Sequence, residues 1–117
     1  MRRTLIVTGA LVAALGVATT TGADARPAAT YKLAAAKTGL KFNVSTIRAK
    51  AGKVTLRMSN PSSLPHAVGI KGKGKGKTVR KGGTSSYTTT LKKGTYTFYC
   101  PVDGHKAAGM KGKLVVS

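Results

Sequence analysis

The amino-acid sequence predicts an all-β domain, a sandwich or a barrel, on three observations. Several short segments alternate apolar and polar residues with a period of two, which is typical of half-buried strands. Glycine, proline and asparagine form turn signals between these segments. No segment has the length and capping of a stable helix, since the alanine-rich run 33–37 is too short. The 117 residues are enough for one domain.

The first two expected strands are recognised by their apolar faces. The first spans 40–44, and the second spans 53–59, where the alternation is clearest. Their apolar faces consist of Leu40, Phe42 and Val44 in the first strand and of Val54, Leu56 and Met58 in the second. Because Met58 continues the stripe of its strand, we expect it to be a core residue.

Three further expected strands carry chemically active side chains. A strand that begins at His66 directs this side chain inward, by the same alternation. The strand 95–100 ends with Cys100 on its core-facing side. The last strand covers 110–116 and begins with Met110. Turns at glycine, proline and asparagine positions separate these strands from one another.

The charge of the chain excludes several classes of enzyme. There are 21 Lys plus Arg residues, no glutamate and only two acidic residues, Asp24 and Asp103. Most glycosidases, two-metal phosphoryl transferases and EF-hand proteins need several carboxylates in one site. These classes are therefore not expected.

Residues 1–25 have the composition of a signal peptide. Two arginines precede an apolar run that is shorter than a transmembrane span, and a small-x-small site follows it. We expect cleavage and export to the periplasm, the cell envelope or the medium; an uncleaved N-terminal anchor is the alternative. A flexible lead over 26–30 and a single domain over 31–117 follow. Cleavage leaves 19 basic residues and one acidic residue, a net charge near +18.

Residues 71–77 alternate lysine with glycine, and the basic segment 80–83 extends this run. Alternating glycine disfavours ordered structure and like charges repel, so we expect a solvated, flexible excursion between two strands. An electrostatic docking surface is the alternative. The segment has no P-loop pattern and leads into no expected helix, so it is not a phosphate-binding loop.

Four side chains can form a specialised site, and three of them lie within 100–110. They are His66, Cys100, His105 and Met110. Two imidazoles, one thiolate and a weak axial thioether are the ligands of a blue-copper electron-transfer site. Each residue taken singly is more often structural, but the four together in this spacing favour a metal. A metal also explains an exported domain whose single cysteine permits no internal disulfide.

The segments 60–66, 94–100 and 104–112 closely resemble the plastocyanin/azurin family of cupredoxins, and the resemblance extends over about 31–117. It implies a Greek-key β-sandwich with one copper ion, Cu(I) or Cu(II), in a type 1 site. The implied ligands are His66, Cys100, His105 and Met110. The resemblance also implies that electrons pass through the solvent-near His105. The chain departs from the family at Ala67, where an asparagine often ties the two ligand loops together.

We therefore expect an exported blue-copper protein that carries single electrons and is not an enzyme. Its charge favours an acidic redox partner and association with an anionic envelope surface, and we expect a monomer. Copper storage or delivery through the same ligands is the alternative function. Nucleic-acid binding is not expected, because no aromatic platform or recognition helix accompanies the charge. A cysteine hydrolase would leave Met110 unexplained.

Overall fold

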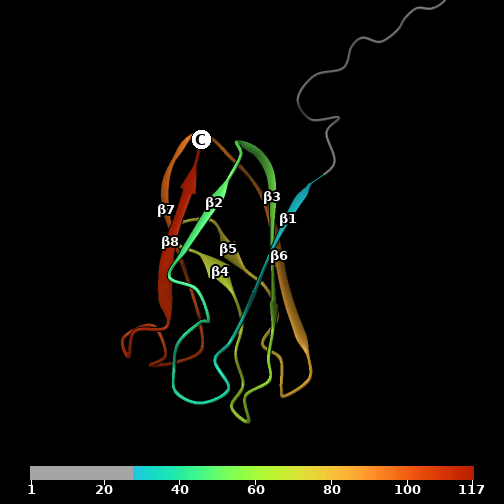
Figure 1. Ribbon diagram of the computed structural model, residues 1–117, viewed down its shortest axis with the longest axis vertical. Coiled ribbons are helices and arrows are strands. Elements are labelled where there is room, and N and C mark those ends of the chain that lie inside the picture. The colour runs from blue at the N-terminus through green and yellow to red at the C-terminus, as the bar shows by residue number, and fades with distance from the viewer. Residues whose placement is uncertain (1–27) are drawn as a thin grey trace, which may run out of the picture.

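The computed structural model describes residues 28–117, which form two β-sheets packed face to face (Figure 1). One sheet has the strand order β1-β3-β6 and the other has the order β2-β8-β7-β4-β5. The expected all-β sandwich is confirmed. The strands are β1 (Ala29–Ala34), β2 (Thr46–Ala49), β3 (Gly52–Ser59), β4 (Gly69–Ile70), β5 (Gly74–Lys75), β6 (Thr84–Leu91), β7 (Gly94–Tyr99) and β8 (Lys111–Val116).

The described residues contain no helix, and so none that is long and apolar enough to cross a membrane. The expected signal peptide, residues 1–25, lies outside the described part of the chain.

Strands that are distant in the sequence lie side by side. β1 pairs with β3 and β2 pairs with β8, both in parallel, whereas β3–β6 and β7–β8 are antiparallel. A parallel neighbour cannot be reached by a tight hairpin, so the chain crosses between the sheets. As a result β8 lies between β2 and β7, and the loop 100–110 is held by paired strands at both ends.

The interior of the sandwich is formed by the apolar faces that the alternation predicted. Val54, Leu56 and Met58 of β3 have no exposed surface, and they share one cluster with Phe98 of β7 and Leu114 of β8. Burial of each such side chain stabilises the fold by roughly 1.5–3 kcal/mol. Met58 is thus confirmed as a core residue.

The strand expected over 40–44 is wrong. Phe42 makes only an isolated bridge to Ala35, in a loop that the side chain of Asn43 fixes by accepting a hydrogen bond from Ala34 N at 2.9 Å. Phe42 is still buried, with its ring centroid 5.3 Å from that of Phe98. The alternation thus identified a core residue but not its backbone conformation.

Three strands had no clear signal in the sequence. β6 is mostly polar, because the strand lies at a sheet edge and pairs only with β3. β2 has four residues, too few for a periodic pattern. β1 begins at Ala29 and so includes the last two residues of the expected flexible lead 26–30.

The lysine-glycine segment 71–77 is more ordered than expected. Its residues Gly74–Lys75 form β5, which pairs with β4 in an antiparallel hairpin. Glycine is required there by close approach, since a Cβ on Gly74 would lie 2.6 Å from the hydroxyl oxygen of Tyr87. The glycines therefore allow the hairpin to pack against β6, which repetitive composition alone did not indicate.

Candidate metal centre

The expected ligands come together at one end of the sandwich. The loops 60–68 and 100–110 lie at the end opposite the C-terminus (Figure 1). Loop 60–68 precedes β4, and loop 100–110 joins β7 to β8. Since β4 and β7 are paired in the same sheet, their adjacent ends bring the two loops into contact.

The sulfur and nitrogen atoms of three residues converge. Cys100 Sγ lies 3.9 Å from His66 Nδ1 and 3.5 Å from His105 Nδ1. The ligand atoms of the three residues all lie within 4.8 Å of one another, and the imidazole centroids are 5.0 Å apart. One sulfur and two nitrogens thus surround a space that suits a single metal ion.

His66 is fixed by its backbone. Its N–H donates to Val79 O at 3.1 Å and its carbonyl accepts from Val79 N at 2.8 Å, although His66 lies outside the regular strands. The imidazole is fully buried, and its Nε2 has no hydrogen-bond partner. Leaving a buried polar atom without a hydrogen bond destabilises a protein by about 1–3 kcal/mol. Such a cost is often accepted at a functional site, and here the Nδ1 atom of the same ring faces Cys100 Sγ.

Two effects lower the pKa of His66 from its ordinary value of 6.5. The larger is burial of the imidazole, and the smaller is repulsion from the His105 side chain. The lowered pKa keeps the ring neutral at neutral pH. A neutral imidazole is the form that binds a metal, because its free nitrogen has a lone pair.

Asn60 holds the loop that carries His66, and sequence reasoning missed this role. Its side-chain amide donates to Leu64 O and to Val79 O, both at 2.9 Å, and its side-chain oxygen accepts from Ser62 N at 2.9 Å. Asn60 therefore ties the loop to the residue that pairs with His66. Asparagine at the head of a proline-containing turn was the only signal, and it did not reveal the bond to Val79.

Cys100 lies just beyond β7, where its backbone N–H donates to Met110 O at 3.0 Å. Its sulfur is fully buried and accepts a hydrogen bond from Ala67 N at 3.5 Å. This backbone N–H links the two ligand loops at the position where an asparagine side chain often does so in the resembled family. An N–H directed at the sulfur helps to fix its position between the two loops.

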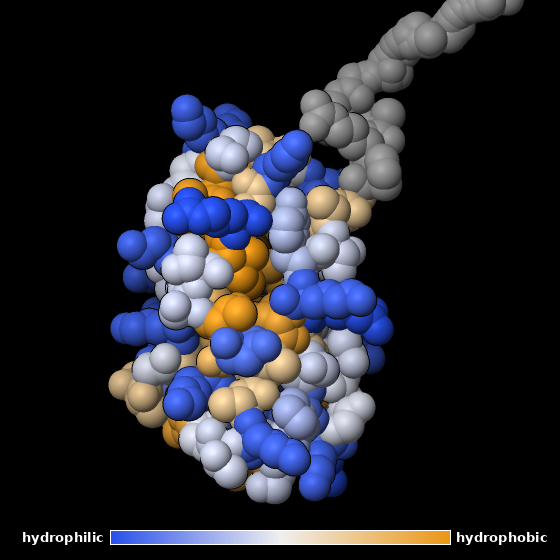
Figure 2. Space-filling view, in the orientation of Figure 1, coloured by the Kyte–Doolittle hydropathy of each residue, from blue (hydrophilic) through white to orange (hydrophobic). Residues whose placement is uncertain are grey.

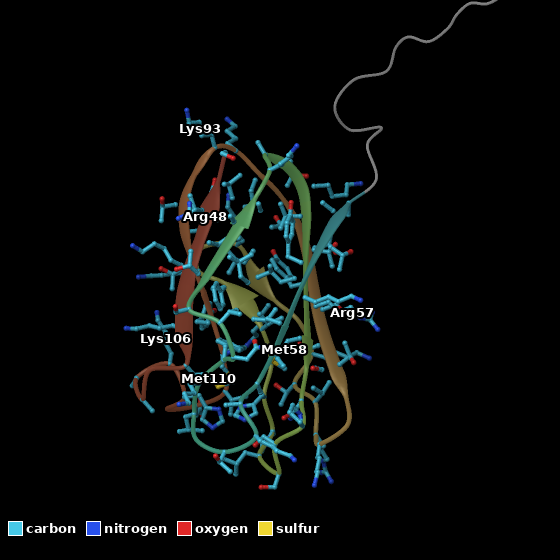
Figure 3. All side chains as sticks on the ribbon, in the orientation of Figure 1. Arg48, Arg57, Met58, Lys93, Lys106 and Met110 are labelled. Carbon is cyan, nitrogen blue, oxygen red and sulfur yellow. The ribbon has the colours of Figure 1, made fainter. Side chains whose placement is uncertain are left out.

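Tight turns shape the rest of the loop 100–110. His105 N donates to Val102 O, and Met110 N donates to His105 O, both at 3.0 Å. His105 is half-buried, whereas Met110 is fully buried immediately before β8, at the ligand end of the sandwich (Figure 3). The four expected residues are thus neighbours; the role of Met110 as a ligand stays a prediction.

The donor set selects the kind of metal. Thiolate and imidazole suit copper, iron or zinc, whereas magnesium and calcium prefer oxygen. Asp103 is the only acidic residue in the described part of the chain, and it is exposed on the ligand loop. The centre is therefore a nitrogen and sulfur site.

A comparison of the sequence with known families decides between these metals. Residues 7–116 match the cupredoxin-like domain family. The chain belongs to this family. In this cupredoxin, His66, Cys100 and His105 are positioned to hold one copper ion, and the copper cofactor expected from the sequence is thereby confirmed.

Solved structures support the cupredoxin fold. Auracyanin B aligns with a TM-score of 0.71 and 24% identity, over 79% of this chain and 91% of that one. Auracyanin A of Chloroflexus aurantiacus, described as a "blue" copper protein, gives 0.67 and 22%, over 78% and 100%. A reduced amicyanin variant gives 0.58 and 25%, over 81% and 89%. These structures share the β-sandwich of this cupredoxin.

Proposed function

We propose that this cupredoxin is an exported blue-copper protein that carries single electrons between redox partners. The observation that carries the proposal is the convergence of Cys100 Sγ with Nδ1 of His66 and His105. Copper bound by one thiolate and two imidazoles supplies one-electron redox chemistry. The protein contributes the fixed positions of the three ligands, so that little rearrangement accompanies a change in oxidation state.

In this proposal Met110 would supply its thioether as the fourth ligand of the copper ion. Its backbone bonds to both Cys100 and His105, and burial excludes water from its thioether. A weak axial thioether tunes the reduction potential of such a site. The proposal includes no enzymatic step; among residues 28–117 the one carboxylate side chain is that of Asp103, which is exposed.

Addition of one equivalent of Cu(II) to the metal-free protein tests the proposal. An intense blue colour with narrow copper hyperfine splitting is expected, and Cys100→Ser abolishes both. A colourless wild-type product, or colour that survives Cys100→Ser, contradicts it. Reversible cycling of the bound ion without its release distinguishes a carrier from a storage protein.

The axial role of Met110 has a matched control in Met58, which is also fully buried. Met110→Leu is expected to keep the colour but raise the reduction potential, because a donor to the oxidised ion is lost. Met58→Leu makes the same change in the core and is expected to leave the reduction potential unchanged. Equal potentials for wild type and Met110→Leu exclude the thioether as a ligand.

Export is supported by the composition of residues 1–25. N-terminal sequencing of protein from the cell exterior or periplasm is expected to begin at Arg26. The high positive net charge supports an acidic redox partner and an association with an anionic envelope surface, and within residues 28–117 Asp103 is the single acidic residue. We propose that the carrier acts as a monomer.

A further inference from the structure

A basic hollow lies on the outer face of the five-stranded sheet. It has a volume of about 400 Å³, and four lysines from three separate segments line it together with two hydroxyl-bearing residues. The lining residues are Ser45, Lys71, Thr97, Lys106, Lys111, Gly112 and Lys113. No acidic side chain is among them, so the hollow concentrates positive charge.

The sheet register explains why these side chains gather. Thr97 of β7 pairs with Lys113 of β8, so both side chains stand on the outer face. Lys71 joins them because its N–H donates to Thr97 O at 2.9 Å. The first lysine of the lysine-glycine segment is thereby placed beside the strand that leads to Cys100.

The hollow continues toward the metal centre. Lys106 and Lys111 also line a second hollow, whose wall includes Tyr99, Cys100 and the acidic Asp103. The Lys106 ammonium lies 5.2 Å from the centroid of the Tyr99 ring, a cation–π contact that orders it between the two hollows. A partner seated in the first hollow thus lies beside the segment that carries the thiolate.

We propose that this hollow is the docking surface for the acidic redox partner, and that it accepts carboxylate side chains projecting from that protein. No acidic side chain lines this hollow, so its four ammonium groups repel one another, and bound carboxylates relieve that repulsion; Asp103, which lines the adjoining hollow with Lys106 and Lys111, offsets it only there. Ser45 and Thr97, which also line the hollow, carry hydroxyl groups that can form hydrogen bonds with a carboxylate. A flat anionic bilayer instead meets the outermost lysines, so the concave shape favours a protein. This inference rests on the proposed electron-carrier function.

A labelled glutamate octapeptide serves as the probe for a carboxylate-rich surface. The double variant Lys71→Glu/Lys113→Glu reverses two charges in the hollow without altering Lys106 or Lys111, which adjoin the expected ligands. We expect about tenfold weaker peptide binding by fluorescence anisotropy at low salt, since each exposed charge pair contributes modestly. Binding by the wild type is expected to weaken steeply as salt rises.

The double variant Lys92→Glu/Lys93→Glu is the matched control. It changes the net charge equally, but in the exposed turn between β6 and β7; Lys93 and Lys106 lie toward opposite ends of the sandwich (Figure 3). This control is expected to lose less than threefold in binding. Equal losses for the two double variants would overturn the proposal, because net charge rather than the hollow would then govern binding.

Two further measurements locate the site and separate it from the copper chemistry. In the ¹⁵N-labelled Cu(I) protein, the peptide is expected to shift the amide signals of Thr97, Lys111 and Lys113; shifts confined to other strands overturn the proposal. If the Lys71→Glu/Lys113→Glu variant binds the peptide as the wild type does but no longer binds phosphatidylglycerol vesicles, the surface binds a membrane. That result also overturns the proposal. Blue colour on copper addition is recorded for every variant, so failure of the carrier function is seen independently of peptide binding.

Discussion

The two loops that supply the metal ligands are built in opposite ways. The loop 60–68 is bound to the rest of the sandwich by the Asn60 side chain and by backbone hydrogen bonds to Val79 and Gly83. Its residues Asn60, Ser62 and His66 are all buried. The loop 100–110 is closed mainly by its own backbone hydrogen bonds, and many of its residues are exposed. Figure 2 shows that hydrophilic and hydrophobic residues both lie on the surface at this end of the sandwich. One loop therefore belongs to the packed body, and the other is a local structure between two strands.

In the part of the chain that the structure describes, few hydrogen bonds join the two loops apart from the contacts among the expected ligands. The Ala67 N–H reaches Cys100 Sγ at 3.5 Å, and the side chain at position 67 is only a methyl group. The shape of each loop therefore depends on that loop's own hydrogen bonds and not on the other loop. Changes in the first loop should disturb the fold and the site together, whereas changes in the second should affect the site with a smaller effect on the fold.

The largest effect is expected for Asn60→Ala. The substitution leaves Leu64 O, Val79 O and Ser62 N without their side-chain partner, so the free energy of unfolding should fall by about 2–4 kcal/mol. Because Val79 pairs with His66, the visible and EPR spectra of the copper-loaded variant should also change. Urea denaturation measures the first effect.

Asn43→Ala is the control for this substitution. Asn43 is exposed and accepts one hydrogen bond, from Ala34 N, so its loss should cost less than about 1 kcal/mol and leave the spectra unchanged. Similar losses for the two variants would show that Asn60 has no special part in holding the first loop.

A smaller effect is expected for Gly109→Ala in the second loop. Gly109 has a φ of 109°, which L side chains rarely adopt, and a Cβ there meets no atom within 4 Å. The cost is therefore backbone strain alone, about 1 kcal/mol. Since Gly109 precedes Met110, the reduction potential should shift as well.

Gly39→Ala separates strain from position. Gly39 has a φ of 85° and equally open surroundings, but it lies in the loop before β2. The Gly39→Ala variant should show a similar decrease in the free energy of unfolding, with no change in the reduction potential. A shift in potential for both variants, or for neither, would contradict the view that Gly109 shapes the site.

The sequence predicted the features that depend on neighbouring residues. Strand alternation placed Leu56 and Met58 in the core and Cys100 on the inner side, because side-chain direction follows from backbone period alone. Ligand chemistry indicated His66 and His105, because few metals accept sulfur and nitrogen together in this way.

The features that the sequence did not reveal depend on distant segments. The polar strand β6 exists because β3 offers it a partner, and β5 exists because Gly74 can approach Tyr87. The role of Asn60 depends on Val79, nineteen positions away. No local pattern encodes such contacts, since hydrogen bonds between loops are fixed only when the whole sandwich has formed.

The smallest effect is expected from pH, and it arises mainly in the buried loop 60–68. Burial of the imidazole lowers the pKa of His66 below its ordinary 6.5, so the unfolded chain takes up a proton before the folded one does. The copper-free protein should therefore lose stability as the pH falls from 6.5 toward the lowered pKa, and no further through this group below it. His66→Gln should flatten this part of the curve in urea denaturation series between pH 7.5 and about 5. An unchanged slope would mean that a group outside the buried loop takes up the proton.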